Sequence, residues 1–207
     1  MRKEGKLDLF LGRAERLTPL DQIPCKANWQ AARYRYVLEK HGRAGVEDVS
    51  ARLADPALRR AFVDPPPTMA WTNVGTVVAI DRAILDGPMS GDVARMRHFG
   101  AEIAKYDVPG LYRAFFRLGT PAFVMGKIPL VFNQYFRRGT IRVTPGPARA
   151  ELTLEDIVLP YYLCEHGIAG WLDAMLELVR ARQPLVRQAR CVHRGDPACA
   201  WEASWRP

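Results

Sequence analysis

The chain has 207 residues, of which 48% are hydrophobic and 25% are charged. This length and balance fit one soluble globular domain with a buried core, and they exclude disorder and coiled coil. The apolar stretches around 123–136 and 157–163 are interrupted by charge or proline, so neither reaches the roughly 20 residues of a bilayer span. The apolar segment after the charged N-terminus is too short for a signal peptide. We therefore expect a single cytoplasmic domain without a membrane span.

The chain is basic, with a net charge of +8 from 30 Lys and Arg against 22 Asp and Glu. Charge of this size attracts polyanions such as nucleic acid. The basic residues are dispersed in pairs such as Arg137 and Arg138, without a long run. No zinc-finger spacing, RNA-recognition motif or helix-turn-helix accompanies them. We interpret the charge as a solvated arginine-rich surface, and a weak anion or nucleic-acid binder is an alternative that depends on charge alone.

Helical periodicity dominates the first two thirds of the chain. Gly42 should end the first helix, and Pro129 should kink the last. Pro65–Pro67 forces an extended break, which separates a helical N-terminal part, 1–67, from the core of the domain, 68–207. The helices are predicted over 26–41, 46–53, 56–62, 73–85 (with a strand as the competing interpretation), 92–105, 109–118 and 121–138.

After Gly139 the pattern changes to alternating apolar and polar residues, which is typical of strands. Strands are predicted over 140–144, 148–154, 185–193 and 199–205, and a helix is predicted over 160–180. The order is strand, strand, helix, strand, strand. We therefore expect an α+β fold in which the helix-rich N-terminal two thirds pack on a C-terminal antiparallel sheet.

Three of the four cysteines lie in the last quarter of the chain. If the final hairpin turns symmetrically about Gly195, Cys191 and Cys199 face each other, with β-carbons about 4.5–5.5 Å apart. Cys164 lies near the start of the preceding helix and supplies a third thiol for a tetrahedral zinc site. Buried structural thiols are the favoured alternative, because the spacing matches no common zinc motif. The candidate metal ligands are Cys164, Cys191, Cys199 and His166, with Glu165 or His193 as other choices for the fourth position.

The segment from Cys191 to Trp205, with its Gly195–Pro197 turn and the glycine-containing helix before it, resembles the C-terminal signature of the 4-vinyl-reductase domain. That domain belongs with the TRAPP transport-complex subunits and the haem-NO-binding fold. The stretch from Leu111 to Trp205 also resembles an uncharacterised myxobacterial family of similar length. The resemblance implies a compact α+β domain, often dimeric, that encloses a hydrophobic cavity.

The resemblance also implies two kinds of cofactor. Phenol-sensing relatives bind zinc at positions that correspond to Cys164, Gln188, Cys191 and Cys199, and Gln188 departs from the glutamate of that pattern. Haem-binding relatives need an axial histidine and a Tyr-x-Ser-x-Arg motif. That motif is absent, and His98 is only a lone helical histidine, so we do not expect haem.

The aromatic-rich stretch from Tyr112 to Phe136 must supply much of the core. Part of it could line a ligand cavity, because such cavities are mostly hydrophobic. The candidate ligand-binding residues are Phe116, Phe123, Met125 and Phe132.

No catalytic constellation is found: the sequence lacks a phosphate loop, a Rossmann fingerprint and a nucleophile elbow. Cys164 and His166 are two apart, which on a helix places them on different faces. We therefore expect a non-enzymatic sensory or regulatory module that binds a small hydrophobic ligand or a partner protein, as a homodimer. A zinc-stabilised structural or protein-interaction domain is the alternative.

Overall fold

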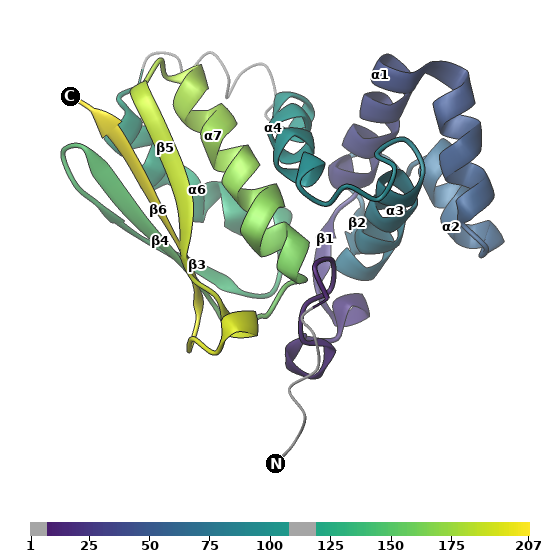
Figure 1. The fold of residues 1–207 in the computed structure, drawn as a ribbon, viewed down its shortest axis with the longest axis horizontal. Coiled ribbons are helices and arrows are strands. Elements are labelled where there is room, and N and C mark those ends of the chain that lie inside the picture. Colours follow the sequence, from purple (N-terminus) through teal and green to yellow (C-terminus); the bar gives the residue numbers. More distant parts are fainter. Residues whose placement is uncertain (1–7, 108–118) are drawn as a thin grey trace.

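Two groups of helices and a four-stranded sheet make up the computed structural model, which describes residues 8–107 and 119–207 (Figure 1). The predicted helix over 109–118 lies outside the described residues. The helices are α1 (Asn28–Arg52), α2 (Pro56–Val63), α3 (Val74–Asp86), α4 (Arg95–Asp107), α6 (Pro121–Tyr135) and α7 (Ile168–Leu178). The strands are β1 (Pro24–Lys26), β2 (Trp71–Asn73), β3 (Thr140–Pro145), β4 (Arg149–Glu155), β5 (Arg182–Arg190) and β6 (Cys199–Arg206).

The predicted α+β class is confirmed. Figure 1 shows the sheet with α6 and α7 against one of its faces, and α1, α2 and α3 on the far side of α4. No helix in the described ranges is long and apolar enough to cross a membrane.

The predicted helices over 26–41 and 46–53 correspond to two helical segments of α1, which meet at a kink at Gly42. Gly42 adopts φ 65° and ψ −165° inside it, a conformation that glycine reaches at little steric cost. The first helical segment therefore ends at Gly42, as predicted, and the second segment follows it.

The sheet has the order β3-β4-β6-β5, and all its neighbours are antiparallel. Leu152 pairs with Trp201, and both are buried on the face that α6 and α7 cover. Arg190 pairs with Ala200. The next residue of the chain, Cys191, therefore comes opposite Cys199, as the predicted hairpin requires. The other face carries exposed ion pairs: Arg142–Glu155, Arg187–Glu202 and Arg190–Glu151.

Glycines bring α4 into direct backbone contact with the C-terminal part of the chain. A β-carbon on Gly100 would lie 2.3 Å from the carbonyl oxygen of Gly167, and one on Gly170 would lie 1.9 Å from that of Arg97. Real side chains do not tolerate such distances, so only glycine permits this crossing. It fixes α4 against α7 and against the π-helical turn Leu163–Gly167 that precedes α7.

A small second sheet, which periodicity did not predict, joins the N-terminal part of the chain, before residue 67, to the part that follows it. Cys25 in β1 pairs with Thr72 in β2, and on its other side it forms an isolated bridge with Phe136 at the end of α6. Each of these strands has three residues, too few to show a period in sequence.

Candidate functional site

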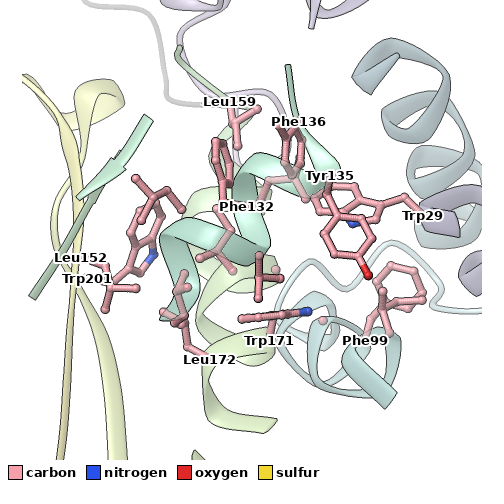
Figure 2. A pocket seen from close by; sticks show the side chains of 18 of the residues that line it. Trp29, Phe99, Phe132, Tyr135, Phe136, Leu152, Leu159, Trp171, Leu172 and Trp201 are labelled. Atoms are coloured by element: carbon pink, nitrogen blue, oxygen red, sulfur yellow. The ribbon is translucent and has the colours of Figure 1, made fainter. Parts of the chain in front are cut away.

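An apolar cavity of about 110 Å³ lies between the N-terminal helices and the sheet layer. Figure 2 shows aromatic side chains converging on it from several elements. The rings that line it are Trp29 of α1, Phe99 of α4, Phe132 and Tyr135 of α6, Phe136, Tyr162, Trp171 of α7 and Trp201 of β6. The cavity therefore has walls from the N-terminal helix α1 and from the later helices and the sheet, and neither group of elements encloses it alone.

Ring-to-ring contacts hold this wall in place. Trp29 meets Phe136 edge to face with ring centres 4.9 Å apart, and Phe132 stacks on Phe136 at 4.6 Å. Such pairs add about 0.5–1.5 kcal/mol each beyond the area that they bury. The β1–Phe136 bridge fixes the backbone of the same corner.

A buried polar network closes one side of the cavity. The Arg33 guanidinium donates to both Asp81 carboxylate oxygens at 2.6 and 2.8 Å and to the Trp29 carbonyl at 3.0 Å. The Tyr162 hydroxyl donates to Asp81 at 2.5 Å. Burial, and then the Asp81 charge, raise the pKa of Tyr162 well above its ordinary value, so the phenol stays neutral. The charges of the wall are thus paired with each other.

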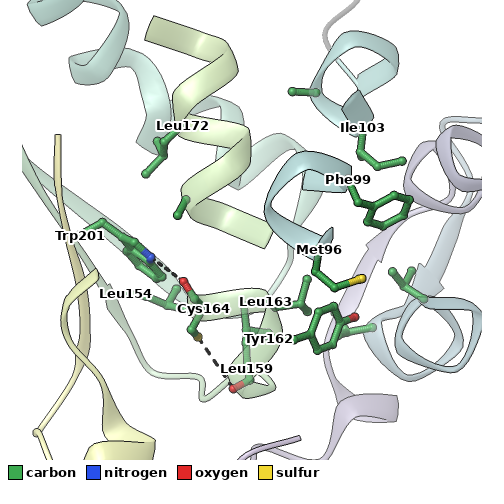
Figure 3. Close-up of a cluster of buried hydrophobic side chains, with 14 of the residues drawn as sticks. Met96, Phe99, Ile103, Leu154, Leu159, Tyr162, Leu163, Cys164, Leu172 and Trp201 are labelled. Carbon is green, nitrogen blue, oxygen red and sulfur yellow. Dashed lines mark hydrogen bonds between the residues drawn. The ribbon is translucent and has the colours of Figure 1, made fainter. Parts of the chain in front are cut away.

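A π-helical turn supplies another part of the wall. Leu163 and Gly167, at the two ends of this turn, both line the cavity. The Trp201 indole donates to the carbonyl oxygen of Cys164 at 2.7 Å (Figure 3). This bond satisfies a carbonyl within the irregular turn and ties it to β6. Single π-turns are frequent at functional sites.

The candidate ligand-binding residues are placed differently from one another. Phe132 lines the cavity. Met125 is fully buried but is not part of its wall. Phe123 is 40% exposed, with the Lys127 ammonium over its ring. Phe116 lies outside the described residues. A ligand-binding role for these four residues stays a prediction.

The structure brings the three late cysteines together without making a metal site. A side-chain hydrogen bond with Cys164 raises the pKa of Cys199 to about 12, and a hydrogen bond with Cys199, together with burial, raises that of Cys191. All three are buried and free.

His166 does not join the cysteines. It is half-buried, burial lowers its pKa, and the charges that act on it are those of Glu165, Arg97 and Asp92. No group of three or more metal-binding side chains in the described part of the chain could hold a metal ion. The zinc prediction is therefore wrong for the described residues, in which the three cysteines lie buried and free.

Comparisons with known proteins define the fold. No protein-family model and no curated protein matches this sequence. A solved H-NOX protein from S. oneidensis in the Fe(II)NO ligation state has a TM-score of 0.63 at 15% identity, over 88% of this chain and 99% of that one.

Two other solved structures agree. An unliganded Fe(II) H-NOX protein from K. algicida has a TM-score of 0.62 at 8% identity, over 88% of this chain and 97% of that one. An oxygen-binding H-NOX domain related to soluble guanylate cyclases has a TM-score of 0.61 at 10% identity, over 88% and 95%. At such identities the likeness shows the fold, so this chain has the fold of H-NOX (haem-NO-binding) domains.

These matches correct two predictions. The assignment to the 4-vinyl-reductase domain and to a myxobacterial family is wrong, because the structures that match are H-NOX domains and no family model supports the assignment. The expectation that haem can be set aside is also wrong for this fold, because the matching structures include domains with bound Fe(II) and an oxygen complex. The residues that line this cavity must therefore be checked for groups that could hold haem.

The side chains around the cavity do not fit a histidine-ligated haem. None of the four histidines of the sequence lines the cavity: His98 is exposed on α4, and both ring nitrogens of His193 are hydrogen-bonded elsewhere. Met96, Tyr135 and Tyr162 are wall residues of a type that proteins use on haem iron, and the Tyr162 hydroxyl is already bonded to Asp81. The volume of about 110 Å³ is also well below the roughly 300–1,000 Å³ of pockets for larger ligands.

Sequence reasoning missed the polar network and most of the aromatic wall. One signal was present: Asp81 interrupts the apolar run 74–85, and a carboxylate on a buried helix face requires a buried partner. That partner, Arg33, lies 48 positions away, so the sequence alone could not identify it.

Proposed function

We propose that this protein is a non-enzymatic sensory domain that binds a small, uncharged, apolar molecule in the cavity between its two parts. The observation that carries the proposal is the cavity itself, an aromatic-walled space whose charged wall residues, Arg33 and Asp81, are paired with each other. The H-NOX fold supports it, because the matching structures hold small ligands in the states that were solved.

The size and polarity of the cavity limit the class of ligand that it can bind. An apolar engineered cavity of about 150 Å³ stays dry and binds benzene or xenon, and the present cavity is of that order. A charged ligand would have to break the Arg33–Asp81 pair or remain unpaired, which is costly in a buried site. A single aromatic ring or a short alkyl group meets neither penalty.

The geometry of the wall supports a binding role over catalysis. Asp81 is held by Arg33 and Tyr162, and Tyr162 is held as a neutral donor. A general base needs a free acceptor in reach of its substrate. In the part of the wall that the structure describes, neither side chain offers one.

Thermal unfolding in the presence of benzene tests the proposal. Ligand that binds only the native state raises the melting temperature. Ile103→Phe adds volume to the wall and should abolish this rise, because Ile103 lines the cavity. Leu130→Phe adds a ring at a position that is 57% exposed on α6 and outside the wall, so it should keep the rise. A wild-type melting temperature that is indifferent to benzene and xenon would remove the proposal.

Titration with haemin is the second arm of this experiment. The proposal expects no stoichiometric Soret band. A one-to-one band that Tyr135→Phe or Met96→Leu abolishes would replace the small apolar ligand with haem.

The predicted homodimer is checked on the same preparation by light scattering.

A further inference from the structure

Residues 8–18, here called the N-terminal strap, cross the outside of the segment 157–163, whose inner side forms part of the cavity wall. Leu159, Tyr162 and Leu163 are the wall residues of that segment. We infer that the strap is a reversible latch on the cavity: it stays docked over a small guest and is displaced by a guest larger than the present volume. The inference rests on the proposed function for its ligand, but the docking of the strap can be measured without one.

Backbone pairing joins the strap to the wall. The amide of Tyr161 donates to the Leu11 carbonyl at 3.2 Å, and that of Tyr162 donates to the Phe10 carbonyl at 3.0 Å. The Phe10 ring stacks flat on the Tyr162 ring, with centres 4.1 Å apart and planes 2° from parallel. Tyr162 thus has the strap on one side and the Asp81 network on the other.

His193 fastens the strap from the side of the final hairpin. The Arg13 amide donates to His193 Nδ1 at 2.9 Å, so the hydrogen sits on Nε2, which donates to the Leu159 carbonyl at 2.8 Å. One buried imidazole therefore bonds the strap and a wall residue at once. Gly12 makes room for it: Gly12 has φ +82°, and a β-carbon there would lie 2.5 Å from Nδ1.

The strap can leave without unfolding the core. Among its residues whose exposure is described, Phe10 alone is buried, and Leu9 is 59% exposed. Segments with few buried contacts open at low free-energy cost while the rest of the protein stays folded.

The segment 157–163 has the cavity on one side and the strap on the other, so it couples guest size to strap docking. A guest larger than about 110 Å³ presses on the wall residues, and the crossing of Gly100 with Gly167 blocks expansion toward α4. Moving Leu159 and Tyr162 instead breaks the bonds to His193 and Phe10. Since coupling between two sites is reciprocal, a weaker strap should bind large guests more tightly and leave small guests unchanged.

Gly12→Ala in the full chain tests the latch, with Gly91→Ala as its control. Both glycines have positive φ, +82° and +77°, but nothing lies within 4 Å of a β-carbon on Gly91. Hydrogen exchange should accelerate on the order of tenfold at the amides of Tyr161 and Tyr162 in Gly12→Ala and should stay unchanged there in Gly91→Ala. Unchanged exchange in Gly12→Ala, or equal acceleration in both, overturns the latch.

Probe binding tests the coupling on the same variants. Gly12→Ala should bind naphthalene several-fold more tightly than wild type and should bind benzene equally well. Equal changes for both probes, or none, overturn the coupling. If exchange responds as expected but neither probe binds any variant, the proposed function and the coupling fail together while strap docking is still demonstrated.

A milder variant guards against misfolding of Gly12→Ala. The exposed side chain of Arg16 donates to the Val192 carbonyl at 3.0 Å, so Arg16→Ala loosens the strap without a steric clash. It should change exchange and naphthalene affinity in the same direction as Gly12→Ala but by less, and an opposite sign would contradict the inference.

Discussion

The Tyr162 hydroxyl donates a 2.5 Å hydrogen bond to Asp81, a residue 81 positions away that has no exposed surface. Asp81 also holds Arg33 through two bonds. A buried ion pair is strongly destabilised when one partner is removed, because the other charge is left uncompensated. This three-residue network therefore joins α1, α3 and the segment before α7, with Asp81 at its centre.

Asp81→Asn should destabilise the protein more than Tyr162→Phe. The first substitution leaves the Arg33 charge buried and unpaired, at a cost of about 3–5 kcal/mol. The second removes one hydrogen bond to a carboxylate that keeps its arginine, at a cost of about 1.5–3 kcal/mol. Urea unfolding measures both, and equal losses would show that the network does not depend on the ion pair.

Gly100→Ala should destabilise the protein by about 1–3 kcal/mol or more, because the added methyl group overlaps the Gly167 carbonyl oxygen at 2.3 Å. Gly126→Ala is the matched control. It also lies inside a helix, α6, but nothing lies within 4 Å of its added β-carbon, so it should stabilise by about 0.5–1 kcal/mol through helix propensity alone. Thermal denaturation distinguishes the signs, and a stabilising Gly100→Ala would contradict the close crossing.

Glu102 should make stability depend on pH in the acid range. Burial acts to raise its pKa, but hydrogen bonds and charges from Lys105 and Lys40 outweigh it and lower the pKa from 4.5 to about 2. A carboxyl whose folded pKa is lower than its unfolded pKa contributes stability above the unfolded value and loses it as pH falls. The contribution is therefore complete above pH 4.5 and lost toward pH 2. Glu102→Gln should unfold with less acid dependence in this window, and an unchanged profile would exclude Glu102 as its source.

The thiols should be unreactive in the native protein at pH 8. All four cysteines are buried, and the pKa of Cys199 is raised to about 12, so almost no thiolate is accessible. Ellman's reagent should react slowly with native protein and rapidly with four thiols in denaturant. A fast phase of reaction in the native protein would contradict the burial of the four cysteines.

The C-terminal half was predictable because its signals are local. Alternation fixed four strands within a few residues of their observed bounds, and the turn at Gly195 placed Cys191 near Cys199. The same locality misled the assignment of a family and a metal. A hairpin signature describes one turn and two thiols, whereas the arrangement of helices around the cavity identifies the fold.

The cavity was not predictable, since its wall comes from residues that are far apart in sequence. Trp29 and Trp201 line the same space, and no periodicity relates them. The π-helical turn over Leu163–Gly167 lies inside the segment 160–180, which was predicted as a regular helix. Phe132 lies in an apolar helix that was predicted to contribute, but its direction toward the cavity is set by α6 packing on β3.

Because the cavity has walls from both parts of the chain, whatever occupies it completes the interface between them. A guest would act as a removable core side chain, and its binding free energy would add to the cohesion of the two parts as RT ln(1 + [L]/Kd). The same molecule would thereby be signal and structural support, and a cell depleted of it would hold a domain that is looser at its centre.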